Sequence, residues 1–396
     1  MPERKNTLFP NSRRHAGVRA VITGQVGVDK KPFLARVAAI AQSKGHPTTV
    51  CHVGDMMYAE APDVAPGRIL DLPRPRLDSL RRSVFKDILR TAEQTENLLV
   101  NTHATFRWKH GLFPAFDHDQ MTALDADLYI TLVDNVDAIH ERLIREHDVP
   151  HTLKDILVWR EEEILATEVM SRIIRGHGCF FVVSRGVERD TALSVYRLLF
   201  ERNRRKVYPS FPMTHVINVP QILTQIDLFR NALTEHFITF DPGDMDEKRL
   251  LYEAGAATQR GERQFNIEVN NRRLTFSVDQ VTSVADDIDG QIYARDFKLI
   301  DQSDMIVSFI PELPDGRPAL SSGVERELQH AFEATREVYV IWPSRIEPSP
   351  FITETATEVF PSLEHAFRSF QKRGYVGEYQ LPLNHHSAPP NRGLFG

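Results

Sequence analysis

The sequence has few cysteines, no long apolar run and little net charge, and each of these absences argues against a class of protein. Only two cysteines, Cys51 and Cys179, occur among 396 residues, and they follow no metal-ligand spacing. Two thiols cannot build a disulfide framework, which indicates a reducing compartment. No apolar run reaches the length of a membrane helix, and the start "MPERKNTLFPNSRRH" has no apolar core. We therefore expect a cytoplasmic protein with neither signal peptide nor membrane span.

The composition is that of a globular protein with two or three domains. Hydrophobic residues make up 41% of the chain, and the formal charge is −6. This balance gives no strong nucleic-acid signal, although a local basic patch stays open. The 16 histidines are scattered without ligand spacing, so we predict no metal site.

Short β-rich runs alternate with helical patterns in the first half of the chain. The runs are "VRAVITG", "TTVCHVG", "NLLVNTH", "DLYITLV" and "CFFVVS". Such alternation predicts an α/β domain over residues 17–205, with a parallel sheet covered on both faces. The charged and then proline-punctuated stretch 201–214 is typical of a linker.

A second, smaller α/β domain is predicted over residues 213–372. We expect its first strand at "HVINVP" (215–220) and an insertion at 240–285 with a hairpin at "QFNIEVNNRRLTFSV". Further on, "GQIYARDFKLIDQS" and "GVERELQHAFEATR" predict helices, and "DMIVSFIP" and "EVYVIWPS" predict buried strands. The tail 373–396 has too little apolar content to fold alone.

The segment "ITGQVGVDKKP" lies where the first predicted strand meets the first helix. A phosphate loop of the form G-x-x-x-x-G-K-[ST] cradles phosphates with backbone N–H groups and holds Mg²⁺ with its hydroxyl. Gly24, Gly27 and Lys30 are present, but Asp29 replaces the second required glycine and Lys31 replaces the hydroxyl residue. Lys30 and Lys31 would still attract a phosphate without a metal, or Asp29 would pair with one of them.

The loop and the strands after it resemble archaeal-type adenylate kinases across roughly residues 17–200, which implies a P-loop kinase fold. Asn101 stands where that family usually has an acidic residue, and of the family's lid arginines Arg142 and Arg145 remain. Phosphoryl transfer depends on the metal, lysine and arginines that position phosphate, so we do not expect an active kinase. A sensor for ATP or another nucleotide and a scaffold or assembly module both stay open.

The segment 289–331 carries the strongest chemical signal. Its parts "IYARD", Asp304 before "MIVSFI", and "SSGVERELQHA" resemble the nucleoside 2-deoxyribosyltransferase superfamily, in particular the 2′-deoxynucleoside 5′-phosphate N-hydrolases. The resemblance implies a flavodoxin-like α/β domain in which Glu327 is the nucleophile and Asp296 contacts the base or sugar. We interpret Asp304 as a structural cap between helix and strand.

These residue types suit cleavage of an N-glycosidic bond. The reaction passes through an oxocarbenium-like sugar, which one carboxylate attacks or stabilises while a second carboxyl manages protons at the base. Transferases of the superfamily usually have Asp where this chain has Ser321. We expect Ser321, Ser322 and Gly323, at a helix N-terminus, to bind a 5′-phosphate.

Two departures from this family accompany the motif. Glu325 adds a negative charge near the expected phosphate site, which Arg326 or Arg317 would offset. The predicted first strand also lacks the glycine and the nearby tyrosine that the family usually has.

We therefore predict an N-glycosidase, or a deoxyribosyltransferase, that acts on a nucleoside 5′-monophosphate or related nucleotide and needs no cofactor. The resemblance implies a homo-oligomer, and a protein partner or activator stays open. Two alternatives remain, a non-enzymatic nucleotide-binding assembly protein and a residual nucleotide kinase. The motif helix is also compatible with a purely structural, solvated amphipathic helix.

Overall fold

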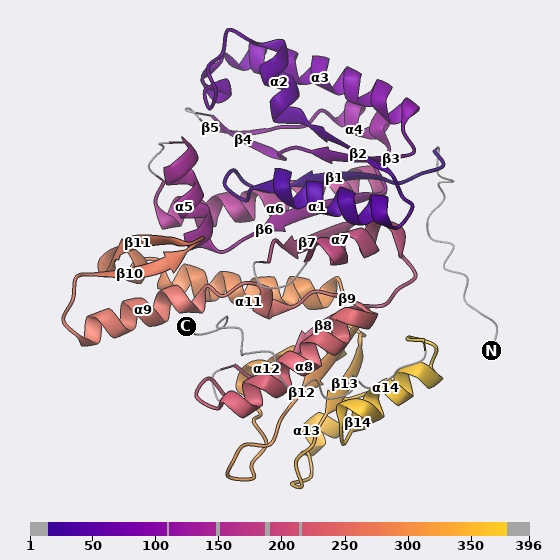
Figure 1. The fold of residues 1–396 in the computed structure, drawn as a ribbon, viewed down its shortest axis with the longest axis vertical. Coiled ribbons are helices and arrows are strands. Elements are labelled where there is room, and N and C mark those ends of the chain that lie inside the picture. Colours follow the sequence, from indigo (N-terminus) through magenta and orange to yellow (C-terminus); the bar gives the residue numbers. More distant parts are fainter. Residues whose placement is uncertain (1–14, 109–110, 148–150, 187–190, 214–215, 378–396) are drawn as a thin grey trace. The chain divides into compact units, whose positions relative to one another are not determined.

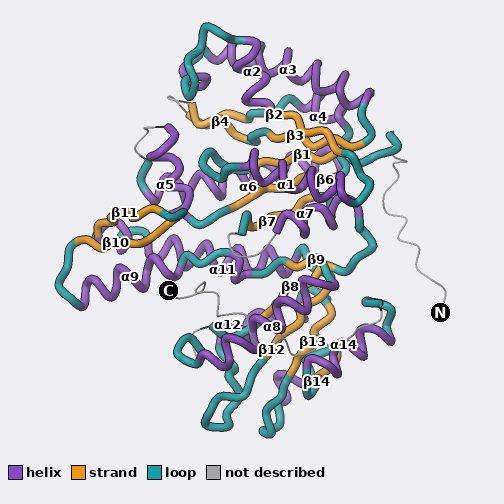
Figure 2. Tube along the Cα trace, viewed as in Figure 1, coloured by secondary structure: helices purple, strands orange, loops and turns teal. Residues whose placement is uncertain are grey.

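The computed structural model describes residues 15–108, 111–147, 151–186, 191–213 and 216–377. Helices and strands alternate along these residues (Figure 2). They form two compact units. One contains the described residues up to Thr23, with Lys30–Ile130 and Leu165–Phe180, and the other contains Gly24–Asp29, Thr131–Ile164 and the described chain from Phe181 onward.

The first half of the chain contains the predicted phosphate loop (Figure 1). Its elements are β1 (Arg19–Thr23), α1 (Lys30–Ser43), β2 (Thr48–His52), α2 (Val53–Glu60), the 3-10 helix η1 (Ile69–Asp71), α3 (Arg74–Gln94), β3 (Asn97–Asn101), β4 (Thr105–Trp108), β5 (Gly111–Pro114), α4 (His118–Leu124), β6 (Leu128–Val133), α5 (Val136–His147), α6 (Leu153–Arg175), β7 (Phe180–Ser184) and α7 (Thr191–Phe200). All five strands predicted here are confirmed, in a parallel sheet of order β2-β3-β1-β6-β7. The antiparallel pair β4–β5 was not predicted.

The apolar runs form strands because they are covered on both sides. Every residue of β3 is buried, and Leu98 and Val100 belong to an apolar cluster with Val84, Phe85 and Ile88 of α3. Burial on both faces explains why β3 reads as a continuous apolar run rather than an alternating one.

The chain after Phe200 forms the second set of elements. They are β8 (Lys206–Ser210), α8 (Pro220–His236), β9 (Ile238–Thr239), the 3-10 helix η2 (Pro242–Asp244), α9 (Lys248–Gln259), β10 (Gln264–Val269), β11 (Arg272–Ser277), α10 (Val278–Thr282), α11 (Ala285–Asp301), β12 (Met305–Phe309), α12 (Ser322–Glu333), β13 (Glu337–Ile341), α13 (Pro350–Thr353), β14 (Glu358–Phe360) and α14 (Leu363–Lys372). A second parallel sheet has the order β14-β13-β12-β8-β9.

The start of this sheet corrects two predictions. The expected linker 201–214 contains strand β8, and the expected strand 215–220 is wrong, because residues 216–218 form a turn before α8 begins. Pro209 misled the prediction, since proline lacks the N–H that a central strand uses. The structure tolerates it because the short β9 pairs only with Lys206 and Val207 and ends before reaching Pro209.

The hairpin predicted within the stretch 240–285 is confirmed. The hairpin is β10–β11, and its turn residues Asn270 and Asn271 have φ of 50° and 60°. Both values suit a tight turn that asparagine tolerates. The same segment also contains helix α9, which was not predicted.

The two faces of the second sheet differ in chemistry. Val207 and Val307 belong to an apolar cluster with Phe229 of α8 and with Phe367 and Phe370 of α14. Because successive strand residues point to opposite faces, Tyr208 and Ser210 lie on the other face. That face packs against α11 and α12, the two helices that carry the resemblance motif.

Candidate active site

Glu327 lies in the second turn of α12 and contacts the polar face of β8. Its Oε1 accepts a hydrogen bond from the Tyr208 hydroxyl at 2.9 Å, and its Oε2 accepts one from Ser210 Oγ at 2.6 Å. The Ser210 hydroxyl is also 3.4 Å from Ser308 Oγ on β12. Both carboxylate oxygens are thus held by hydroxyl groups from a buried strand, which fixes the direction of the side chain.

Asp296 of α11 is the second carboxyl of this site. Its Oδ1 accepts from Arg295 Nε at 3.2 Å and from Arg295 Nη2 at 3.1 Å. The charge of Asp296 acts on both Glu327 and Tyr208, so these three residues form one electrostatic cluster. The structure brings together the two residues that the sequence assigned to catalysis.

Burial and like charge control the protonation of this cluster. Burial, and then the negative charge of Asp296, raise the pKa of Glu327 to about 8, against the opposing hydrogen bonds from Ser210 and Tyr208. Burial also raises the pKa of Asp296, although Arg295 opposes the shift. The pKa of Tyr208 is raised by burial and by the two carboxylates, so its hydroxyl stays protonated and able to donate. Such perturbed carboxyl pairs are typical of functional sites.

Sequence reasoning missed Tyr208 and Ser210, because both lie in the stretch interpreted as a linker. The signal that could have found them is the alternation in "KVYPS", in which Tyr208 and Ser210 share one face of a strand. The second sheet thus has a tyrosine on β8, whereas the predicted first strand at 215–220 has none.

Asp304, interpreted above as a structural cap, lies between the end of α11 and the start of β12. Its Oδ2 accepts from Lys206 N at 2.8 Å and from Lys206 Nζ at 3.0 Å. The carboxylate thus joins the start of β12 to the start of β8, at the opposite end of β8 from Ser210.

The predicted phosphate-binding residues lie at the N-terminus of α12. Ser321 is the N-cap, and its Oγ accepts from Val324 N at 3.3 Å. Ser322 and Gly323 are exposed in the first turn. Glu325 lies in the same turn, and Arg317, one of its two expected counter-charges, is paired with Asp315 at 2.6 Å instead. The site residues are thus close in sequence and in space, but the local charge does not favour an anion by itself.

The phosphate loop contacts charged groups of its own unit. Asp29 has φ of 61°, the left-handed conformation that explains why phosphate loops have glycine at this position. Its carboxylate is paired with Arg185 at 2.9 Å, a partner that neither alternative drawn from the sequence included. Gly24 N donates to Glu163 Oε1 at 3.3 Å.

Two other residues of the loop differ in their hydrogen bonding. Arg142 Nη1 donates to Gly27 O at 2.8 Å and to Asp134 Oδ2 at 2.7 Å. Gln25 is only 2% exposed, yet in the part of the chain that the structure describes neither atom of its amide has a hydrogen-bond partner. A buried amide of this kind is costly unless a ligand or water satisfies it.

The other residues assigned to kinase chemistry also have partners. Lys30 is buried, whereas Lys31 is exposed and pairs with Asp55 at 2.6 Å. Asn101 Nδ2 lies 2.9 Å from His52 Nδ1. Arg145 lies 3.4 Å from Glu141, one turn earlier in α5.

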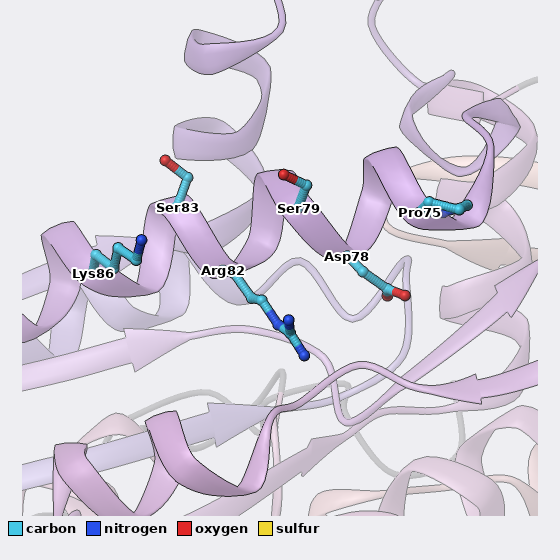
Figure 3. Close-up of a pocket in the computed structure, with 6 residues that line it drawn as sticks. All are labelled: Pro75, Asp78, Ser79, Arg82, Ser83 and Lys86. Atoms are coloured by element: carbon cyan, nitrogen blue, oxygen red, sulfur yellow. The ribbon is translucent and has the colours of Figure 1, made fainter.

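A surface hollow of about 540 Å³ lies away from these residues. All the residues that line it belong to α3, and Figure 3 shows their side chains along this helix. They are Pro75, Asp78, Ser79, Arg82, Ser83 and Lys86. Its lining contains none of the predicted site residues.

Within the described ranges, no group of three or more histidine, cysteine or acidic side chains is placed to hold a metal ion. No described helix is both long and apolar enough to cross a bilayer.

Comparison with known proteins agrees with the fold of the first half. Residues 23–156 match the model of a family described as an AAA domain. Together with the parallel sheet and the strand–loop–helix at Gly24, this match decides the class. The first half of the chain is a P-loop kinase-like domain.

Solved structures include similar folds. Shikimate kinase from Bacteroides thetaiotaomicron is 14% identical, with 46% of this chain and 98% of that chain covered and a TM-score of 0.32. A gluconokinase from Sinorhizobium meliloti 1021 is 15% identical, with 48% and 97% covered and a TM-score of 0.30. At these scores neither carries an argument about function. No curated protein matches the chain.

Proposed function

We propose that this protein cleaves the N-glycosidic bond of a nucleoside 5′-monophosphate or a related nucleotide, with water or a second base as the acceptor. One observation supports the proposal above all others. Glu327 accepts hydrogen bonds from two hydroxyl groups, and burial, followed by the charge of a second carboxyl, raises its pKa. A carboxylate so oriented is a nucleophile prepared for C1′ of a sugar.

In the proposed reaction, an ionised Glu327 oxygen forms a bond to C1′ while the bond from C1′ to the base nitrogen breaks. The electron pair of that bond goes to the base, which takes a proton from Asp296. Water then attacks C1′, the ester bond to Glu327 breaks, and the proton of the water returns to Asp296. Tyr208 and Ser210 stabilise the carboxylate form that begins and ends the cycle.

The pair has to contain one proton for this sequence, on Asp296 and not on Glu327. Coupled carboxyls titrate as a pair, so activity should follow the singly protonated state. We therefore expect a bell-shaped pH profile. The proton of the singly protonated pair exchanges between the two carboxyls, and the form with the proton on Asp296 reacts. The alkaline limb should lie near 8, where the pair loses its last proton. The acid limb should lie above the ordinary pKa of aspartate, where the pair gains its second proton.

The proposed phosphate subsite is the N-terminus of α12. The exposed Ser322 and Gly323 supply a hydroxyl and backbone N–H groups, and the helix dipole favours an anion there. Glu325 opposes this charge preference, so the subsite should be weak on its own.

Chromatography of released base tests the function directly. The pure protein is incubated with ribo- and deoxyribonucleoside monophosphates, ATP and NAD, beside Glu327→Gln. Glu333→Gln is the matched control, since it makes the same change on an exposed position of the same helix. Base from the wild type and the control but not from Glu327→Gln supports the proposal. No base from any substrate would reject it.

A second candidate is nucleotide binding without turnover at the loop Gly24–Asp29. The unpartnered, buried amide of Gln25 within that loop favours it. Titration with ATP, with and without Mg²⁺, should then show saturable binding that Lys30→Ala weakens. Mg²⁺-dependent formation of ADP would instead indicate a residual kinase. The resemblance to adenylate kinases and the homo-oligomer stay predictions.

A further inference from the structure

A buried arginine of α6 joins two elements beside the candidate active site. Arg160 Nη1 and Nη2 donate to the two oxygens of Glu247 at 2.7 and 3.2 Å. Its Nε and Nη2 also donate to Gln291 Oε1 at 3.1 and 2.5 Å. Glu247 is the N-cap residue of α9 and Gln291 lies on α11, so a single guanidinium holds both helices.

The contact on α11 is close to the catalytic carboxyl. Gln291 lies four residues before Arg295, so the two residues are one helical turn apart on the same face of α11. Gln291 is itself oriented by its Nε2, which donates to Leu157 O of α6 at 3.1 Å. The guanidinium of Arg160, which binds Gln291, therefore fixes the position of the turn of α11 from which Arg295 and Asp296 extend.

Glu247 is part of the same polar cluster as Asp296. Its charge acts on both Arg295 and Asp296, and its Oε1 also accepts from Val136 N at 3.1 Å. Glu247 is 2% exposed, and a carboxylate at that depth needs partners. Arg160 supplies two charge-assisted bonds, which hold the Glu247 carboxylate in place.

We propose that Arg160 and Glu247 are positioning residues for Asp296: the Arg160 fork fixes α11, and the buried Glu247 carboxylate sets how readily Asp296 holds its proton. This inference rests on the proposed function, because it assigns Asp296 the proton that the departing base takes. Neither residue belongs to the motif that suggested the activity, and Arg160 comes from the first half of the chain.

The charged groups around Asp296 come from four elements. Arg295 is on its own helix, Tyr208 on β8, Glu327 on α12, and Glu247 at the start of α9. Asp246, beside Glu247, also interacts with Arg295. Only Glu247 adds negative charge near Asp296 without a contact to Glu327 among the described hydrogen bonds and ion pairs, so its neutralisation should affect one limb of the pH profile alone.

Glu247→Gln is the decisive variant, because it removes the charge while keeping the shape and one acceptor for Arg160. Glu247 favours the protonated form of Asp296, so the acid limb of the profile of kcat/KM should move to lower pH in the variant. The alkaline limb should stay. Glu141→Gln is the matched control, since Glu141 is equally buried and paired with Arg272 at 3.4 Å. A loss of activity with both limbs unmoved would mean a merely structural role and overturn the proposal.

A second readout does not need activity. With ¹³C-labelled aspartate, the carboxyl signal of Asp296 is assigned by its disappearance in Asp296→Asn and titrated in the wild type and in Glu247→Gln. A lower midpoint in the variant supports the proposal even where no substrate is cleaved, in which case the proposed function alone fails. An unchanged midpoint overturns the proposal while leaving the function standing.

Arg160→Lys covers the case in which Glu247→Gln does not fold. Lysine keeps the charge but cannot hold Glu247 and Gln291 in one plane. We expect kcat to fall by about tenfold with KM changed by less than about twofold, because Asp296 is misplaced rather than substrate binding lost. A melting point that falls with kcat unchanged would overturn the positioning role.

Discussion

Removal of the Tyr208 hydroxyl tests the candidate active site at its least expected residue. In Tyr208→Phe the ring stays in the polar face of β8, but Glu327 Oε1 loses the donor at 2.9 Å. Ser210 still donates to Oε2 at 2.6 Å, so the side chain keeps one of its two orienting bonds. The variant therefore separates the role of the hydroxyl from the packing of the strand.

The size of the effect follows from the kind of hydrogen bond. A bond to a charged group contributes about 1.5–3 kcal/mol, and about 1.4 kcal/mol corresponds to a factor of ten. If the nucleophile reacts as the carboxylate, kcat/KM should fall about 10- to 100-fold. Since the bond from Tyr208 lowers the pKa of Glu327, its loss raises that pKa above about 8. The alkaline limb of the pH profile should move to higher pH.

The assay is release of base over a range of pH, with Tyr339→Phe as the control. Tyr339 is a buried tyrosine on β13 of the same sheet, and its hydroxyl donates to Glu337 at 3.2 Å rather than to the site. The control should keep its activity and both limbs. Full activity of Tyr208→Phe, or a fall with an unmoved alkaline limb, would refute the assignment of Glu327 as the ionised nucleophile.

Three further predictions concern stability and the loop. Glu327 has a pKa of about 8 in the fold against about 4.3 in an unfolded chain, so its contribution to stability is present below pH 4 and is lost as the pH rises through 8. As the pH rises from 5 to 9, the melting temperature of Glu327→Gln should therefore increase relative to that of the wild type. A difference that stays constant with pH would contradict the raised pKa. Asp29→Gly relieves a left-handed φ that costs about 1 kcal/mol and removes a carboxylate from the loop, so calorimetry should show tighter ATP binding; unchanged or weaker binding would count against phosphate binding there. Asp241→Ala leaves the fully buried Arg230 without its partner at 2.7 Å and should lower the free energy of unfolding by about 3 kcal/mol in urea, whereas a loss below about 1 kcal/mol would show that Asp244 and Asp227 suffice.

The strands of the first half could be predicted because burial on both faces leaves a simple signal in the sequence. β3 and β6 are buried along their whole length, and both read as continuous apolar runs. β8 gave no such signal. It carries Tyr208, Pro209 and Ser210, because one of its faces serves a polar site and its outer edge is only partly paired. The strand that resembles a loop is thus the strand that lines the candidate site.

The candidate site was predicted where its residues lie on helices next to one another in sequence. Glu327 and Asp296 could be named from their motif, and the structure places them in one cluster. Arg160 and Glu247 could not, since they come from separate elements and meet only in the fold. The phosphate loop shows the same limit: its lost glycine is evident in sequence, but the pairing of Asp29 with Arg185 joins residues 156 positions apart.

The position of Glu327 argues against a purely structural reading of α12. A solvated amphipathic helix keeps its charges in water, as the exposed Glu325 and Arg326 do. Glu327 instead points its carboxylate at two hydroxyls of a buried strand. Burial, and then the charge of Asp296, raise its pKa and cost stability at neutral pH. A glutamine or methionine there would stabilise the fold without that penalty. An electrostatic cost of this kind is expected where a residue serves chemistry.

The loop Gly24–Asp29 shows the reverse, because Arg185 compensates the charge of Asp29 within the fold. Of the two sites, the one that keeps an unfavourable carboxyl pair is the better candidate for catalysis.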